Sequence, residues 1–125
     1  MKRVVQTDRA PKALGPYSVA VESGSMVFLS GQVGIDPATG KLASDAVAGQ
    51  AEQVMKNVAA VLDAAGCSIE DVVKTTIFLA DMADFSAVNE IYGSCFSGDY
   101  PARSTVAVKD LPIGARVEIE VIAMK

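Results

Sequence analysis

The sequence predicts one α+β domain over residues 1–125, in which two long helices cover one face of a single mixed sheet. Three observations support this prediction. The length of 125 residues suits one domain. Short stretches rich in β-branched residues alternate with two longer stretches in which apolar residues recur at steps of three and four. Internal repeats, low-complexity segments and long linkers are absent from the sequence.

The N-terminal part of the chain is predicted to hold three strands and a turn-rich connection. The strands are expected at residues 2–6, 17–21 and 26–30. Residues 10–16 contain two prolines and a glycine and should form a loop, and residues 22–25 should form the hairpin between the second and third strands. Residues 31–41 include Asp36-Pro37 and Thr39-Gly40, which indicate turns.

The remaining elements follow from periodicity. A helix is predicted over residues 45–65, with Asp45 at its start and Gly66 as its stop signal. A second helix is predicted over residues 84–96. Three more strands are expected at residues 72–80, 103–108 and 116–124. With both helices on one face, the other face of the sheet needs a cover, which favours association of several copies.

Composition supports association and argues against a membrane protein. Half of the residues are hydrophobic and the mean hydropathy is +0.32, yet no apolar run approaches the roughly 20 residues of a membrane span. A domain of this size buries only about two-thirds of its unfolded surface. The surplus of apolar side chains therefore favours a homo-oligomer.

Charge and cysteine content limit the partners and the compartment. The net charge is −4 and the pI is about 4.7, and the Lys and Arg residues are scattered, so nucleic acid is not expected as the main partner. The N-terminus lacks the apolar stretch of a signal peptide, and Cys67 and Cys95 match no metal or redox spacing. We expect a cytoplasmic protein in which both cysteines are packing residues.

The absence of histidine narrows the chemistry. Histidine general bases, histidine-containing triads and histidine-ligated metals are impossible within this chain. Catalysis would have to use carboxylates, hydroxyls, thiols, Arg, Lys, backbone groups and water. No pattern in the sequence indicates a metal or an organic cofactor.

Arg103 begins a predicted strand, and alternation places Thr105 on the same face. An arginine beside a hydroxyl can grip a carboxylate or phosphate with two hydrogen bonds. Spacing alone favours the simpler interpretation, a surface arginine in a weak ion pair. In the last strand, Glu118 and Glu120 share the face opposite Val117. They form either a solvated polar face or, if one is partly buried, a proton-transfer group with a raised pKa.

Four further positions are candidates for lining a site. Ser30 and Gly31 end a predicted strand, and Gly31 would let a ligand approach the backbone or would form a simple bend. Tyr17 follows Gly-Pro and is either a cleft phenol or a half-buried strand aromatic. Asn89 falls within the apolar stripe of the second helix, where its amide needs a partner.

Eight segments, in order along nearly the whole chain, resemble the RidA (reactive intermediate deaminase A) family. This family is also called YjgF and was formerly described as L-PSP endoribonucleases or translation initiation inhibitors. The segments are ALGPYS (13–18), LSGQ (29–32), DPATGK (36–41), QVMKNV (53–58), VKTTIFL (73–79), MADFSAVNEIY (82–92), PARSTV (101–106) and RVEIEVIA (116–123).

The resemblance implies a chorismate-mutase-like fold and a homotrimer whose sheets form a barrel-like core, with a ligand cleft in each subunit near a subunit boundary. It implies hydrolysis of 2-imino or enamino acids, such as 2-iminobutanoate and 2-iminopropanoate, to 2-oxo acids and ammonia, without a cofactor. The implied roles are carboxylate binding by Arg103, water activation by Glu118, and backbone contacts from Thr105. Tyr17, Ser30, Gly31 and Asn89 would line the pocket.

The family often has cysteine at the position of Thr105, so a thiolate mechanism at this position is excluded here. Imine hydrolysis needs no thiolate, because a protonated imine is already electrophilic. Two other functions remain open: RNA cleavage with inhibition of translation, and binding of small carboxylates without turnover. The acidic composition is poorly suited to the first.

Overall fold

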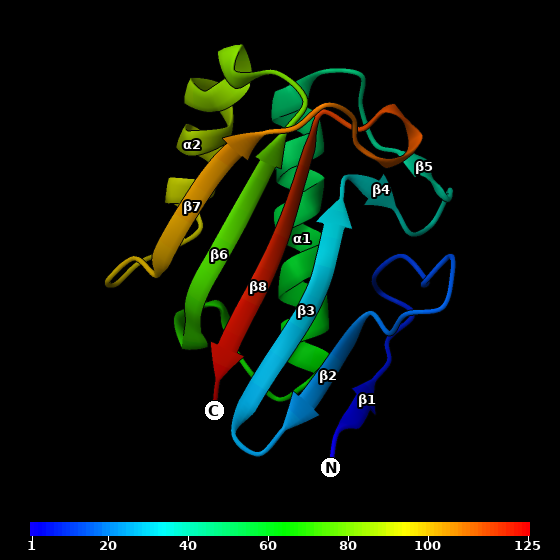
Figure 1. Ribbon diagram of the computed structural model, residues 1–125, viewed down its shortest axis with the longest axis vertical. Helices are drawn as coiled ribbons and strands as arrows, with labels where there is room; N and C mark the ends of the chain where they lie inside the picture. The colour runs from blue at the N-terminus through cyan, green and yellow to red at the C-terminus, as the bar shows by residue number, and fades with distance from the viewer.

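The computed structural model describes all residues, 1–125, and confirms the predicted α+β class (Figure 1). The main sheet has six strands in the order β1-β2-β3-β8-β6-β7. Its strands are β1 (Arg3–Val5), β2 (Ala20–Ser23), β3 (Met26–Val33), β6 (Val72–Leu79), β7 (Ala102–Ala107) and β8 (Val117–Met124). The helices are α1 (Val47–Ala64) and α2 (Phe85–Ser94), with short 3-10 turns at η1 (Ile69–Asp71), η2 (Met82–Asp84) and η3 (Pro112–Gly114).

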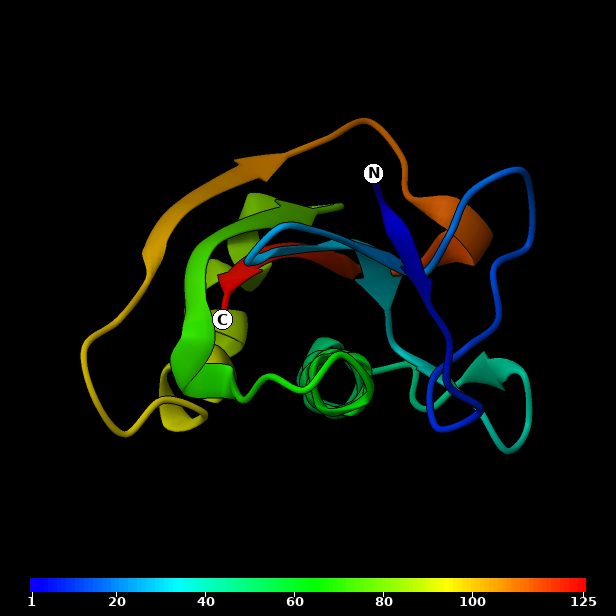
Figure 2. The same cartoon turned by 90° about the horizontal axis from the view of Figure 1, so that it is seen from below.

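The sheet is mixed because of a single parallel pair. β6 and β7 run parallel, and every other neighbouring pair is antiparallel. A parallel pair needs a crossover connection, and α2 supplies it between β6 and β7. Figure 2 shows α1 and α2 on the same side of the curved sheet. The two-layer arrangement therefore agrees with the prediction.

The second strand begins later than predicted. β2 starts at Ala20, and Tyr17 and Ser18 lie in the preceding loop. The cause is a local turn, in which the Tyr17 N–H donates to the Gly15 carbonyl (2.8 Å) and the Tyr17 hydroxyl accepts from the Leu14 N–H (3.3 Å). Tyr17 is thus a loop residue, which corrects its predicted place in a strand.

Residues 31–41 are more regular than predicted. β3 continues through Gly31 to Val33, and β4 (Ile35–Asp36) pairs with β5 (Lys41–Leu42) in a small separate sheet. The predicted turn does occur within this hairpin, where the Asp36 carbonyl accepts from the Gly40 N–H and Gly40 has a φ of 75°. The predicted turn is therefore present, but it is confined to the connection between β4 and β5, and strand residues occupy much of the rest of residues 31–41.

Helix α1 is two residues shorter at its start than predicted and ends at the predicted signal. Its N-cap is Ala46, whose side chain cannot cap, so Asp45 is not the cap. At the other end Gly66 has a φ of 78° and its N–H donates to the Asp63 carbonyl, while the Cys67 N–H donates to the Leu62 carbonyl. These two bonds form a Schellman motif, which favours glycine because the backbone is left-handed there.

Helix α2 covers less of the chain than residues 84–96. Residues 82–84 form a 3-10 turn instead, because the Asp81 carboxylate accepts from the Ala83 N–H (2.9 Å) before the α-helix begins. Val88 and Tyr92 are buried beneath the helix, whereas Asn89 is exposed. Asn89 therefore lies at the edge of the apolar stripe, and its predicted place within that stripe is wrong.

The core lies between the sheet and the helices, and the opposite face of the sheet has no cover. Strand register aligns Val4, Val21, Phe28 and Ile122 in one row across β1, β2, β3 and β8 on this open face. Val4 and Phe28 are exposed. An apolar row of this kind is typical of a surface that packs against another protein. None of the helices has the length and hydropathy needed to cross a bilayer.

Candidate active site in two halves

The last strand places Glu118 on the open face of the sheet. Val117, Ile119 and Val121 point toward the helices and are almost fully buried, so Glu118 and Glu120 point the other way, as predicted from alternation. Glu118 is half-buried and Glu120 is exposed. The two glutamates therefore differ in environment although they share a face.

Gly31 makes room for the Glu118 carboxyl group. The register between β3 and β8 shifts between Leu29 and Gln32, so Ser30 and Gly31 bulge from the ladder. A Cβ atom on Gly31 would lie 2.2 Å from Glu118 Oε2 and 3.0 Å from its Cγ. The carboxyl group thus lies close to the Gly31 backbone, and a side chain at position 31 would displace the carboxyl group from this place.

The environment of Glu118 favours its protonated form. Burial raises the pKa of the Glu118 carboxyl group above its ordinary value, and the negative charge of Glu120 raises that pKa further. A carboxyl group tuned in this direction can exchange protons closer to neutral pH than a solvated glutamate can. Of the two interpretations open for Glu118, the structure agrees with partial burial and not with full solvation.

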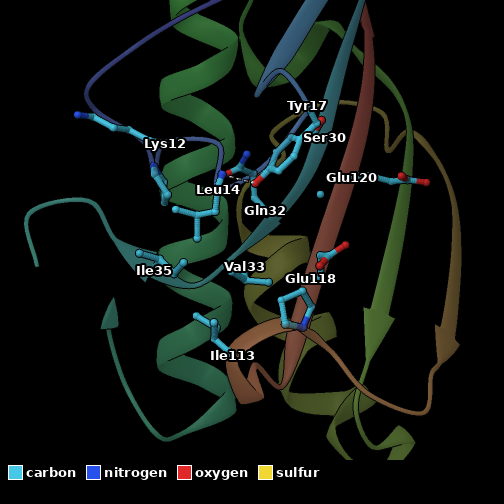
Figure 3. Close-up of a pocket in the computed structure, with 13 residues that line it drawn as sticks. Lys12, Leu14, Tyr17, Ser30, Gln32, Val33, Ile35, Ile113, Glu118 and Glu120 are labelled. Atoms are coloured by element: carbon cyan, nitrogen blue, oxygen red, sulfur yellow. Dashed lines mark hydrogen bonds between the residues drawn. The ribbon is translucent and has the colours of Figure 1, made fainter. Parts of the chain in front are cut away.

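Four predicted residues come together around a cavity of about 410 Å³: Tyr17, Ser30, Gly31 and Glu118. We call this set the glutamate half-site (Figure 3). The Ser30 hydroxyl donates to the Ser18 carbonyl (2.6 Å), which ties β3 to the loop that carries Tyr17. The sequence did not identify the other walls of the cavity, which include Lys12, Leu14, Gln32, Ile35 and Ile113.

Arg103 lies on the opposite face, toward α2. It sits beside Thr75 in the β6–β7 register, and Thr75 is buried among the core residues under the helices. The Arg103 guanidinium donates from Nη1 to Asn89 Oδ1 (2.6 Å). It forms no ion pair with any carboxylate of the chain. The weak-ion-pair interpretation of Arg103 is therefore wrong, and its charge is left uncompensated.

Two aromatic rings of α2 hold the guanidinium. Arg103 Cζ lies 5.6 Å from the centre of the Phe85 ring and 5.1 Å from that of Tyr92. The Tyr92 ring is itself fixed, because it is 4% exposed and its hydroxyl lies 2.7 Å from Thr75 Oγ1 in a hydrogen bond. The aromatic clamp, Phe85 and Tyr92, orients the charge without neutralising it.

Asn89, Arg103 and Thr105 form what we call the arginine half-site. Asn89 and Arg103 line a second cavity of about 720 Å³ together with Tyr92 and Tyr100. Thr105 is two residues along β7 on the same face, and its Oγ1 is buried without any hydrogen-bond partner. A buried hydroxyl usually finds a partner, so Thr105 retains an unused donor and acceptor next to the arginine.

The two half-sites do not meet within one chain. Glu118 faces the open side of the sheet, whereas Arg103 and Thr105 face the helix side, with β6 between their strands. The structure thus brings Tyr17, Ser30, Gly31 and Glu118 together, and separately Asn89 and Arg103. A single ligand can contact both sets only if they come from two copies of the chain.

Sequence reasoning missed the aromatic clamp although part of its signal is in the sequence. Phe85, Asn89 and Tyr92 are spaced by four and three residues, which places them on one side of a helix. The spacing cannot predict the parallel β6–β7 register, which places Arg103 beside Thr75 and under this side of α2.

The fold and the half-sites define a small α+β protein with one clamped, unpaired arginine and one half-buried glutamate. The chain belongs to the Endoribonuclease L-PSP family, whose family model matches residues 7–125. It is 54% identical over 98% of its length to Reactive Intermediate Deaminase A, chloroplastic, of Arabidopsis thaliana, but spans only 65% of that relative, less than two thirds. It is 50% identical over its whole length to 2-iminobutanoate/2-iminopropanoate deaminase of Mus musculus and spans 93% of that protein.

A solved structure shows the same fold with a small ligand. E. coli TdcF with bound serine superimposes with a TM-score of 0.94 at 44% identity, covering 98% of each chain. The resemblance to the RidA family that the ordered motifs indicated is confirmed by these matches.

Proposed function

We propose that this protein is a deaminase that hydrolyses reactive 2-imino and enamino acids, including 2-iminobutanoate and 2-iminopropanoate, to 2-oxo acids and ammonia. The observation that carries the proposal is the unpaired Arg103 guanidinium, held by Asn89 and two aromatic rings. Such a group suits a planar carboxylate, which accepts two hydrogen bonds from it. Relatives at about half identity are named Reactive Intermediate Deaminase A and 2-iminobutanoate/2-iminopropanoate deaminase, which supports the same activity.

The active unit is a homotrimer in which the glutamate half-site of one subunit faces the arginine half-site of the next. Two features support an assembly of this kind. The open face of the sheet carries an apolar row without a cover, and the half-sites lie on opposite faces of each chain. Three sheets around a barrel-like core, as the family resemblance implies, would bury that row and complete one site at each boundary.

In the proposed reaction Arg103 binds the substrate carboxylate and so fixes the imine carbon near Glu118. Glu118 takes a proton from water as the water oxygen bonds to the carbon of the protonated imine, which gives a neutral tetrahedral amino alcohol. Glu118 then returns this proton to the nitrogen and the C–N bond breaks, so that ammonia leaves. The hydroxyl proton passes through Glu118 to ammonia as the carbonyl of the 2-oxo acid forms, and the products are the 2-oxo acid and an ammonium ion. Tyr17, Ser30, Gly31 and Asn89 line the site, and Thr105 lies near the reacting carbon and supplies no thiolate.

This reaction uses an anchor, a proton-transfer group and water, so we propose that it proceeds without an organic cofactor or metal. We also propose that the protein acts in the cytoplasm, a reducing compartment that suits its two free cysteines.

The family name carries a second candidate, RNA cleavage. The net charge of −4 and the absence of histidine weaken this alternative, because phosphate binding depends on clustered basic residues. Salt-sensitive RNA binding and cleavage that is lost in Arg103→Ala would support it. A third candidate is binding of small acids without turnover; it would give 2-oxo acid binding without any acceleration of imine decay.

The deciding experiment follows imine decay in the presence of a threonine dehydratase. We expect wild type to accelerate release of ammonia and 2-oxobutanoate, and Arg103→Ala to lose at least about a hundredfold in kcat/KM, since a charge-assisted bidentate anchor contributes several kcal/mol. Arg9→Ala is the matched control, because Arg9 is an exposed arginine paired only with Asp63. Equal rates for wild type and Arg103→Ala would refute the proposal.

A further inference from the structure

Ile113 has a backbone conformation that its side chain disfavours. Its φ and ψ are 53° and 26°, and it is the only residue other than glycine with a positive φ. It occupies a tight turn in which the Ala115 N–H donates to the Pro112 carbonyl (3.0 Å) and Gly114 follows with a φ of 70°. A turn with two positive φ values favours Asn-Gly, and a β-branched residue at its first position is an outlier.

Core packing does not explain why isoleucine occupies this turn. The Ile113 side chain is 55% exposed, so burial offsets little of the conformational cost. The side chain instead lines the cavity of the glutamate half-site, which Glu118 also lines (Figure 3). Residues with a strained backbone cluster at active sites and ligand-binding sites. The strain at Ile113 therefore points to a ligand in the cavity that its side chain lines.

The cavity has two chemically different walls. Tyr17, Ser30 and Glu118 form a polar wall, which holds the proposed proton-transfer group. Leu14, Ile35 and Ile113 line the same cavity and bring only aliphatic surface. In Figure 3 these three side chains gather on the side of the cavity away from Glu120.

We infer that Ile113 is a specificity-determining residue that contacts the aliphatic side chain of the imino acid. The inference rests on the proposed function. A 2-imino acid has three parts, and Arg103 and Glu118 take up the carboxylate and the imine. The remaining aliphatic group needs an apolar surface of limited size, and the turn that carries Ile113 supplies such a surface to the cavity that Glu118 also lines. The wall therefore favours short side chains.

The test compares imines of different length, generated in place by an amino acid oxidase from alanine, 2-aminobutyrate and leucine. In Ile113→Ala we expect the ratio of kcat/KM for the leucine-derived imine to that for 2-iminobutanoate to rise about tenfold, because a few methylene groups in an apolar pocket change discrimination by this order. Ile113→Val, which shortens the side chain by one methylene, should fall between wild type and Ile113→Ala.

A second readout separates this role from a structural one. Ile113→Asn places the residue that the turn favours, so we expect its Tm to rise by about 3 °C or more. The same variant should lower the ratio of kcat/KM for 2-iminobutanoate to that for 2-iminopropanoate relative to wild type, because a polar wall gains less from the extra methylene of 2-iminobutanoate. A stabilised protein with altered selectivity is the combined result that supports the inference.

Three outcomes would overturn it. Selectivity ratios that stay within about twofold of wild type in all three variants, while wild type hydrolyses imines, would refute the role of Ile113 and leave the proposed function standing. A change of oligomeric state in these variants would assign Ile113 to a subunit contact instead. Absence of imine hydrolysis by wild type would refute the proposed function, and the inference with it.

Discussion

At the scale of single residues, two neighbours, Gly31 and Glu120, determine the environment and the pKa of Glu118. Gly31 leaves space for the carboxyl group to rest on the backbone of β3, where it is half-removed from water. Glu120, two residues along the same strand, adds a negative charge on the same face. Both effects disfavour the ionised form, so ionisation of Glu118 lowers the stability of the folded state, although the proposed reaction uses the ionised form.

Replacing Glu118 should separate activity from stability. We expect Glu118→Gln to lower kcat by about a hundredfold or more, because the proton-transfer group is lost. The folded-state pKa is raised, so wild-type stability is greatest below the unfolded pKa and declines as pH rises through the folded pKa. Glu118→Gln lacks this decline, so at pH values above the folded-state pKa of Glu118 it should be at least as stable as wild type. The measurement is urea unfolding across a pH series.

Glu120→Gln is the companion variant, because it removes only the neighbouring charge. In the pH profile of kcat/KM, the acidic limb of Glu120→Gln should move to lower pH, because the pKa of Glu118 falls when the neighbouring charge is removed. The activity on the plateau should persist. An unchanged limb in Glu120→Gln would contradict the assignment of this limb to Glu118.

At the scale of elements, the packing of α2 on β7 prepares the arginine. The crossover from β6 through α2 to β7 places two aromatic rings of the helix against a strand residue that comes later in the chain. The Thr75–Tyr92 hydrogen bond then joins the helix to β6. The guanidinium is thereby ordered before a ligand arrives, which reduces the entropy lost on binding.

Weakening the clamp should affect binding more than the chemical step. In Phe85→Leu we expect KM to rise about two- to tenfold, with kcat changed much less, since one cation–π contact is lost and the helix retains an apolar residue. Phe85→Tyr is the matched control, because it keeps an aromatic ring beside Arg103 and should leave KM within about twofold of wild type. Equal effects of the two substitutions on KM would argue against the clamp.

The elements also show which features sequence patterns could predict. Alternation in the last strand correctly assigned Glu118 and Val117 to opposite faces, because β8 is regular from end to end. The same rule failed for Tyr17, where a local turn interrupts the strand pattern. It also could not place Arg103 relative to Glu118, because their faces depend on the order of strands β8-β6-β7, which alternation within one strand does not contain.

At the scale of the whole molecule, the sheet separates the glutamate half-site from the arginine half-site. In the proposed function one ligand contacts both half-sites, so a single chain would carry every required group without completing a site. Under this proposal assembly is part of catalysis as well as a source of stability.

Mixing inactive variants should restore activity if sites form between chains. Glu118→Gln chains keep Arg103, and Arg103→Ala chains keep Glu118, so a boundary with one of each in the right order has both groups. Random assembly of equal amounts should give about a quarter of the wild-type sites. The measurement is imine hydrolysis after the two variants are unfolded together and refolded, and each variant refolded alone serves as the control. No recovery in the mixture would place both groups of each site in one chain.

The position of β7 at the end of the sheet has a further consequence. Its six residues expose an unpaired row of backbone donors and acceptors on one side, and the same chain presents its apolar row on the open face. Exposed strand edges and apolar surfaces are the two features that promote aggregation. We therefore expect an isolated chain to aggregate more readily than an assembled one, because the proposed assembly would cover the apolar row.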